Sequence, residues 1–129
     1  MVYDRPVCRP PFRAADHDEK RDNMNSKIKS PEADYLFQAI LQLKDMDECY
    51  KFFEDLCTVT EIKAMSQRIV VAKMLSEKYV YSEIVRRTGA STATISRVNR
   101  SLEYGCDAYP MVFSRLPADL PLPGEQEEK

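Results

Sequence analysis

The residues best suited to chemistry lie in one short stretch, GASTATISRVNRSLEYG, which spans positions 89 to 105. It places small hydroxyl and alanine side chains directly after a glycine and follows them with two arginines. Small residues near the start of a helix let the backbone approach base edges closely, methyl groups suit thymine methyls, and arginines reach guanine or phosphate. The chemistry that this stretch indicates is recognition of a nucleic-acid groove.

A helical arrangement sorts these residues into two faces. Ile95, Val98 and Leu102 fall together and are predicted to face a core. Ser91 is predicted to cap the helix, whose exposed amides there can bind a phosphate. The opposite face collects the candidate DNA-contacting side chains, which are Ala93, Ser96, Arg97 and Arg100, flanked by Thr92 and Thr94.

A shorter helix precedes this one. The stretch YSEIVRRTGA predicts about two helical turns that end at Gly89, and the next helix is expected to run from near Ser91 to Gly105, with a left-handed cap there. Two short helices joined by a glycine-containing turn have the layout of a helix-turn-helix, here over 81–104, whose second helix enters the DNA major groove. Plain helical bundles also contain such pairs, so the layout alone leaves both interpretations open.

Three further helices are expected upstream. The first begins at Ser30, which has the form of an N-cap before a first-turn proline and an acidic residue. The second, MDECYKFFEDLC, places Cys49, Phe52, Phe53 and Leu56 on one face. Its aromatic density predicts burial partly against another chain, with Tyr50, Phe52 and Phe53 as candidates for that core, although packing within one chain stays open for each of them. The third is expected from a cap at Thr60 to about Glu77.

Composition predicts one small helical domain with tails. The 129 residues are 43% hydrophobic, and no strand alternation or internal repeat stands out. We expect a disordered extension over 1–29, a helical domain over 30–116 and a flexible acidic tail over 117–129. Met24 is a second candidate for the natural start. Apolar runs are too short for a membrane span, and the N-terminus lacks the apolar middle of a signal peptide, so a cytoplasmic location is expected.

The net charge of −2 conceals an uneven distribution. Residues 30 to 60 hold seven acidic side chains against two lysines, whereas residues 61 to 105 hold eight basic side chains against four acidic ones. This modest positive excess also fits an ordinary solvated helix surface, so charge alone does not establish a nucleic-acid partner.

An enzymatic function is not expected, nor is a cofactor or a metal ion. The chain has one histidine, His17, in a predicted tail, and its four cysteines have no CxxC spacing. Its three glycines form no phosphate-binding loop. In a reducing compartment the cysteines are predicted to be free thiols.

Two separated motifs, ECYKFFEDLCT and GASTATISRV, occur in the order typical of one family. Over roughly 31–116 the chain resembles the Trp repressor superfamily, and specifically its YerC/YecD group of Trp-repressor-like proteins. The resemblance implies an all-α, intertwined homodimer with two projecting helix-turn-helix heads, and a transcriptional regulator that binds a two-fold operator in double-stranded DNA. By position, it also implies DNA contacts for Ser82, Val85, Thr92, Ala93, Thr94 and Ser96.

The chain departs from the family where the ligand binds. In the Trp repressor the indole lies between two arginines beside a glycine; here Arg97 matches one arginine, Gln67 replaces the other, and Val98 replaces the glycine. Valine fills the space of the ring and glutamine cannot supply a guanidinium, so tryptophan is not expected as co-repressor. An altered pocket around Gln67, Arg97, Val98 and Ser101 stays open, with its small-molecule effector unassigned.

These observations predict a sequence-specific, homodimeric DNA-binding regulator that does not depend on tryptophan. The alternative is a dimeric helical protein-interaction module that contacts the transcription machinery. The acidic first half of the chain and the modest positive excess of the second keep this alternative open.

Overall fold

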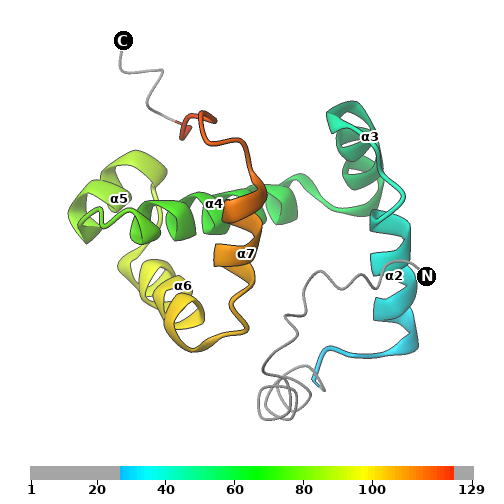
Figure 1. Cartoon of the computed structure of the whole chain (residues 1–129), viewed down its shortest axis with the longest axis horizontal. Helices are drawn as coiled ribbons and strands as arrows, with labels where there is room; N and C mark the ends of the chain where they lie inside the picture. Colours follow the sequence, from blue (N-terminus) through cyan, green and yellow to red (C-terminus); the bar gives the residue numbers. More distant parts are fainter. Residues whose placement is uncertain (1–26, 124–129) are drawn as a thin grey trace. The chain divides into compact units, whose positions relative to one another are not determined.

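The computed structural model describes residues 27–123, and over that range the chain is helical, without strands (Figure 1). This agrees with the predicted all-α class. The predicted disorder of the N-terminal extension concerns residues that lie almost entirely outside the described range. The helices are α2 (Pro31–Ile40), α3 (Met46–Leu56), α4 (Val59–Ser76), α5 (Tyr81–Thr88), α6 (Thr92–Tyr104) and α7 (Ala108–Arg115).

The chain divides into two compact units between Phe53 and Glu54. The first contains α2 and most of α3; the second contains the end of α3 and the helices α4 to α7. The predicted domain boundaries stay predictions. None of the helices between residues 27 and 123 is long and apolar enough to cross a membrane.

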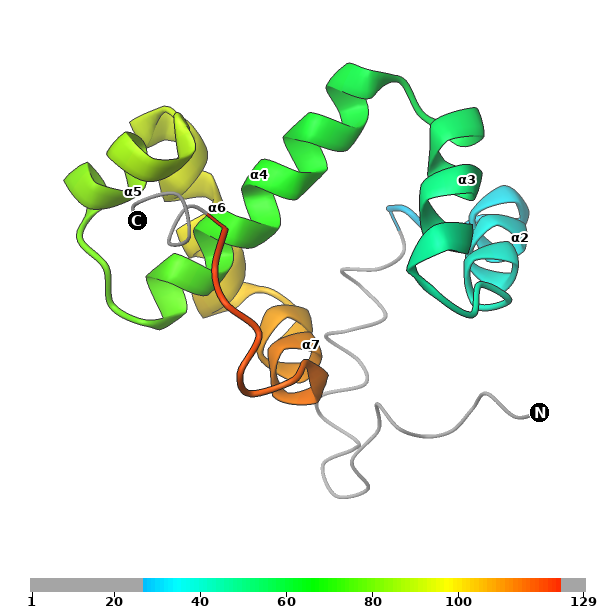
Figure 2. The ribbon, with the colours of Figure 1, turned by 90° about the horizontal axis from the view of Figure 1, so that it is seen from above.

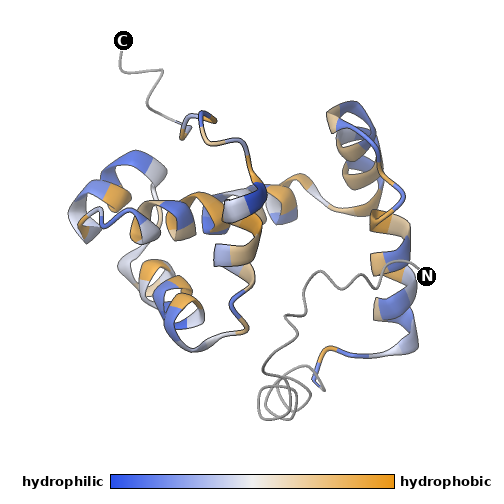
Figure 3. Ribbon diagram, viewed as in Figure 1, coloured by the Kyte–Doolittle hydropathy of each residue, from blue (hydrophilic) through white to orange (hydrophobic). Residues whose placement is uncertain are grey.

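The first unit places apolar side chains on its surface. Helix α2 begins as predicted, because Ser30 Oγ accepts a hydrogen bond from the Ala33 amide at 3.0 Å. Neither α2 nor α3 contains a buried residue, and Tyr35 and Tyr50 are 81% and 71% exposed. Figure 3 shows hydrophobic residues alternating with hydrophilic ones along both helices. These helices therefore leave an apolar surface uncovered within one chain.

Helix α4 starts two residues earlier than the sequence predicted. The cap is Thr58, whose side chain accepts from the Glu61 amide at 3.1 Å, while Glu61 Oε1 accepts from the Thr58 amide at 2.8 Å. This reciprocal pair is a capping box, which satisfies two amide donors at once. The prediction of Thr60 was wrong because Lys63, three residues further on, cannot return the second bond. The predicted end near Glu77 is correct.

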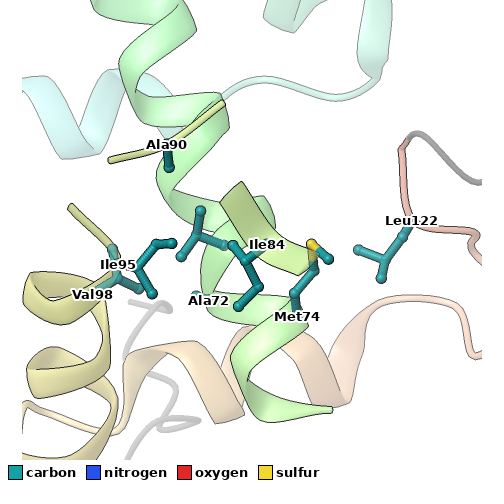
Figure 4. Close-up of a cluster of buried hydrophobic side chains, with 8 residues drawn as sticks. Ala72, Met74, Ile84, Ala90, Ile95, Val98 and Leu122 are labelled. Carbon is teal, nitrogen blue, oxygen red and sulfur yellow. The ribbon is translucent and has the colours of Figure 1, made fainter. Parts of the chain in front are cut away.

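The core of the second unit forms where α5 and α6 pack on the C-terminal part of α4 (Figure 2). Ile84 of α5 and Ile95 and Val98 of α6 meet the buried side chains of α4 there (Figure 4). Leu102 packs against this cluster, so the predicted inward face of α6 is confirmed. The buried residues are Val71, Ala72, Met74, Ile84, Ala90, Ile95, Val98 and Leu122.

The C-terminal part of the described chain also packs on this unit. Helix α7 contacts α4, and the ammonium group of Lys73 lies 5.2 Å from the centre of the Phe113 ring. Beyond α7, Leu122 is 8% exposed and belongs to the core (Figure 4). The predicted flexibility of 117–129 stays a prediction. Within that segment, Leu122 is packed in the core.

Gly105 ends α6 for a different reason from the predicted one. Its φ of −86° and ψ of −151° are extended rather than left-handed. A Cβ at this position would overlap the Ser101 carbonyl oxygen, which accepts a hydrogen bond from the Gly105 amide at 2.9 Å. Glycine is therefore required by close approach of two backbone segments. The left-handed cap that the sequence placed here was wrong.

Candidate nucleic-acid interface

A three-residue turn joins α5 to α6, because α5 ends at Thr88 and α6 begins at Thr92. The helix ends at Gly89 as the sequence predicted, and Gly89 has φ 77° and ψ 4°, the left-handed conformation that favours glycine after a helix. Ala90 is 2% exposed and anchors the turn in the core. The Thr88 hydroxyl donates to the Ile84 carbonyl at 2.7 Å and accepts from the Ala90 amide at 3.1 Å. These bonds hold the turn in one conformation.

The start of α6 is capped as predicted. Ser91 Oγ accepts a hydrogen bond from the Thr94 amide at 3.1 Å and lies 3.1 Å from Thr94 Oγ1. A serine cap satisfies one of the amides at the helix N-terminus, and the remaining free amides point away from the helix there. This end of α6 thus carries hydrogen-bond donors suited to an anion.

The outward face of α6 is accessible along its length. Thr94 is half-buried, and the other predicted DNA-contacting residues are exposed. On α5, Val85 is 36% exposed. Their roles in DNA contact stay predictions; the exposed set comprises Ser82, Val85, Ser91, Thr92, Ala93, Ser96, Arg97 and Arg100.

The arginines of α5 and α6 are in different electrostatic environments. On α5, Glu83 Oε2 lies 2.6 Å from Arg86 Nη2 and 3.3 Å from Arg87 Nε. The Arg87 guanidinium also lies over the Tyr79 ring, 5.3 Å from its centre. By contrast, no ion pair between residues 27 and 123 engages Arg97 or Arg100. The α6 arginines therefore keep their charge available for a partner.

The carboxyl group of Glu83 responds to its arginine neighbours. The hydrogen bond from Arg86, assisted by the charges of Arg86 and Arg87, holds the pKa of Glu83 below its ordinary value and outweighs the opposing effect of desolvation. Glu83 is therefore ionised at neutral pH and partly neutralises the positive charge of α5.

Nothing in the described part of the chain forms a metal-binding group of three or more histidine, cysteine or acidic side chains. Cys49, Cys57 and Cys106 are free thiols, and Cys106 is exposed. The groups that the exposed residues of α6 present are backbone amides, hydroxyls, methyl groups and guanidinium groups.

Comparison with known proteins decides the family of this chain. The family model described as Trp repressor protein matches residues 31–117. The chain belongs to the Trp repressor family. Members of this family are DNA-binding regulators of transcription rather than enzymes, which agrees with the class predicted from the sequence.

Individual relatives support the membership in the Trp repressor family. The uncharacterized protein YerC of Bacillus subtilis (strain 168) is 56% identical over 90 residues, which cover 70% of this chain and 86% of YerC. A TrpR-like protein from Eubacterium eligens ATCC 27750 has a crystal structure that is 62% identical, with a TM-score of 0.69. That match covers 70% of this chain and 94% of the other.

A further solved structure agrees with these two. It is a candidate Trp repressor from Staphylococcus aureus, 54% identical with a TM-score of 0.68, and the match covers 70% of this chain and 91% of that one. The predicted resemblance to the YerC group and the predicted Trp-repressor-like fold are therefore confirmed.

The four positions predicted for an altered ligand pocket differ in burial and contacts. Val98 is 2% exposed and lies in the core between α6 and α4, so its side chain fills space. Gln67 is half-buried and its Nε2 donates to the Thr88 carbonyl at 3.1 Å. Arg97 and Ser101 are exposed. Two of the four positions are thus engaged in contacts within the protein.

Sequence reasoning overlooked Thr88 and Glu83. Thr88 immediately precedes Gly89, at which the helix ends, and a hydroxyl at this position can bond back to the last helical turn. That position in the sequence could have predicted the hydrogen bond to the Ile84 carbonyl. Glu83 stands three and four residues before Arg86 and Arg87, a spacing that places opposite charges on one helix face.

Proposed function

We propose that this protein is a homodimeric, sequence-specific regulator that reads double-stranded DNA with α6 and does not use tryptophan as co-repressor. The observation that carries the proposal is the division of α6 into two faces. Ile95 and Val98 are fully packed, whereas the opposite face exposes small polar residues and two arginines without ion-pair partners among the described residues.

This division fits entry into a major groove. A helix whose core face is fixed presents its other face in one orientation, and small side chains near its start allow close approach to base edges. Arg97 and Arg100 follow one and two turns later and can reach guanine or phosphate. The cap by Ser91 leaves amides at the helix start that suit a backbone phosphate.

The homodimer is supported by the apolar surface of the first unit. Leu41, Met46 and Tyr50 are 63%, 72% and 71% exposed, and α2 and α3 bury no residue within one chain. Exposed large apolar side chains gathered on two helices are typical of a protein interface. In a two-fold dimer, two α6 helices about 34 Å apart meet successive major grooves on one side of the duplex, which implies a two-fold operator.

Independence from tryptophan is supported by two side chains. Val98 adds bulk beside α4 where the family has a glycine, and Gln67 directs its amide to a backbone carbonyl of α5. Neither provides the cationic, open surface that would hold an indole ring. Isothermal calorimetry should therefore detect no tryptophan binding; a micromolar dissociation constant would refute this part of the proposal.

The groove-reading role is tested with the double variant Arg97→Ala, Arg100→Ala and the control Arg115→Ala, which removes an exposed arginine of α7. Gel-shift titration should show a loss of affinity for the double variant and wild-type affinity for the control. The slope of log affinity against log salt should fall by about 1 for each lost phosphate contact. A double variant that folds, dimerises and shifts DNA normally would show that α6 does not enter the groove.

A further inference from the structure

One hydrogen bond connects α4 with the end of α5. Gln67 Nε2 donates to the backbone carbonyl of Thr88 at 3.1 Å, across 21 residues of sequence. The bonds that shape the turn itself, from Thr88 to Ile84 and from Ala90 to Thr88, join residues four and two apart. Gln67 therefore fixes the turn to a different helix, which the local bonds cannot do.

The acceptor is well placed for this connection. Thr88 is the last residue of α5, and carbonyls in the last turn of a helix have no partner within the helix. The same residue uses its hydroxyl to organise the turn before α6. A donor on the Thr88 carbonyl consequently restrains the peptide that leads into Gly89 and, through Ala90 and Ser91, the start of α6.

We propose that Gln67 is a positioning residue that holds the α5–α6 turn against α4, so that α6 is oriented for DNA without a bound ligand. Packing of Ile95 and Val98 in the core sets how closely α6 lies against α4. The Gln67 bond fixes the turn from which α6 begins. Gln67 is half-buried, so water competes only partly for its amide. This inference rests on the proposed DNA-binding function and adds to it the residue that orients the reading helix.

Two variants remove the bond in different ways. Gln67→Leu removes the donor and keeps a side chain of comparable volume. Gln67→Glu keeps the shape but places a carboxylate opposite the Thr88 carbonyl. The matched control is Gln42→Leu, because Gln42 Nε2 also donates to a backbone carbonyl, that of Gln38, at 3.2 Å in an exposed position four residues away. Mass measurement of each variant establishes that the oligomeric state is unchanged.

The first readout is the ratio of affinities for the promoter duplex and a scrambled duplex. Loss of one hydrogen bond should weaken promoter binding by Gln67→Leu about five- to tenfold, with a larger loss for Gln67→Glu, while scrambled-duplex binding stays near wild type. Partial unfolding alone would lower the active fraction in a titration and leave this ratio unchanged.

The second readout needs no DNA. Amide hydrogen exchange of Gly89 and Ala90 should accelerate about five- to tenfold in both Gln67 variants, with no change in the control or at core amides of α6. If the wild type discriminates between the duplexes while the Gln67 variants keep both the ratio and the exchange rates, the inference is wrong and the proposed function stands. If the wild type does not discriminate, the proposed function fails, and unchanged exchange would then also refute the positioning role.

Discussion

The two units of this protein satisfy their apolar side chains in opposite ways. Every buried residue of the described chain lies beyond the unit boundary at Phe53, in or near α4, α5, α6 and the C-terminal segment. The first unit buries none, although α2 and α3 carry several large apolar side chains. The second unit therefore forms a core within one chain, whereas the first forms none, and the proposed dimer would cover the exposed apolar side chains of the first unit.

The energetic difference between the units is large. Burying one large apolar side chain contributes about 1.5 to 3 kcal/mol, so burial of several exposed ones would favour the proposed dimer against the cost of association. In the second unit that contribution is already made by the contacts among α4, α5 and α6. This leaves the polar face of α6 free to bind a different kind of partner.

The largest expected effect comes from Phe53→Ala in the first unit. Phe53 packs edge-to-face with Phe52, with ring centres 5.4 Å apart. If a partner chain completes its burial, truncation should cost about 3 to 5 kcal/mol and shift the protein toward monomer. Analytical ultracentrifugation and urea unfolding at two protein concentrations measure both effects.

The control for this prediction is Tyr104→Ala, an aromatic truncation at a side chain that is 75% exposed in the second unit. It should leave mass and stability near wild type. A Phe53→Ala protein with unchanged mass and Tm would contradict the claim that the apolar side chains of the first unit are buried against a partner chain.

A cavity in the second unit should act without dissociating the dimer. Ile95 is fully buried, so Ile95→Ala should lower the free energy of unfolding by about 2 to 5 kcal/mol, and Ile95→Val by about 0.5 to 1.5 kcal/mol. Chemical denaturation gives these values, and light scattering gives the mass. Dissociation of Ile95→Ala into folded monomers would mean that the second unit also forms the interface.

The two glycines that flank α6 are required for different reasons, which alanine substitutions measure. Gly105→Ala should cost about 1 to 3 kcal/mol because its Cβ would overlap the Ser101 carbonyl. Gly89→Ala should cost about 1 to 2 kcal/mol because of the left-handed backbone, although nothing lies within 4 Å of the added Cβ.

Asparagine distinguishes the two causes. It tolerates the left-handed conformation, so Gly89→Asn should be more stable than Gly89→Ala. Gly105→Asn should be no more stable than Gly105→Ala, since both add the same Cβ. Thermal unfolding of the four variants measures these differences in stability. An equal rise in Tm from alanine to asparagine at both positions would contradict the two different causes.

The smallest expected effect concerns Glu83. Because its pKa is lowered in the folded protein, the contribution of Glu83 to stability is fully present above the pKa of the unfolded chain. That contribution is lost as the pH falls through the lower, folded-state pKa. Glu83→Gln should reduce the pH dependence of Tm in this acidic range, as measured by calorimetric scans. An unchanged profile would show that the arginine pairs of α5 do not contribute.

The helices were predictable where local chemistry determines them. The Ser30 and Ser91 caps, the helix end at Gly89 and the inward face of Ile95, Val98 and Leu102 all depend on residues a few positions apart. The cap of α4 was misplaced because two threonines compete and only Thr58 has a glutamate three residues later.

The exposed residue types of the candidate site were predictable from the sequence, but the contacts that hold α5, α6 and the turn between them in place were not. Spacing within α6 identified its outward face, and Gln67 was singled out by position. The bond from Gln67 to the Thr88 carbonyl joins distant residues through the packing of α4 on α5, which no local pattern encodes. The reason for glycine at position 105, contact with the Ser101 carbonyl, likewise depends on backbone coordinates.

The most direct test of the central claim is fluorescence anisotropy of the purified protein with a duplex from the promoter of its own gene and with a scrambled duplex, over a salt series and without tryptophan. The account predicts preferential binding to the promoter duplex that weakens steeply between about 50 and 200 mM salt and does not change when tryptophan is added. Absent binding, equal binding to both duplexes, or binding that requires tryptophan would contradict it.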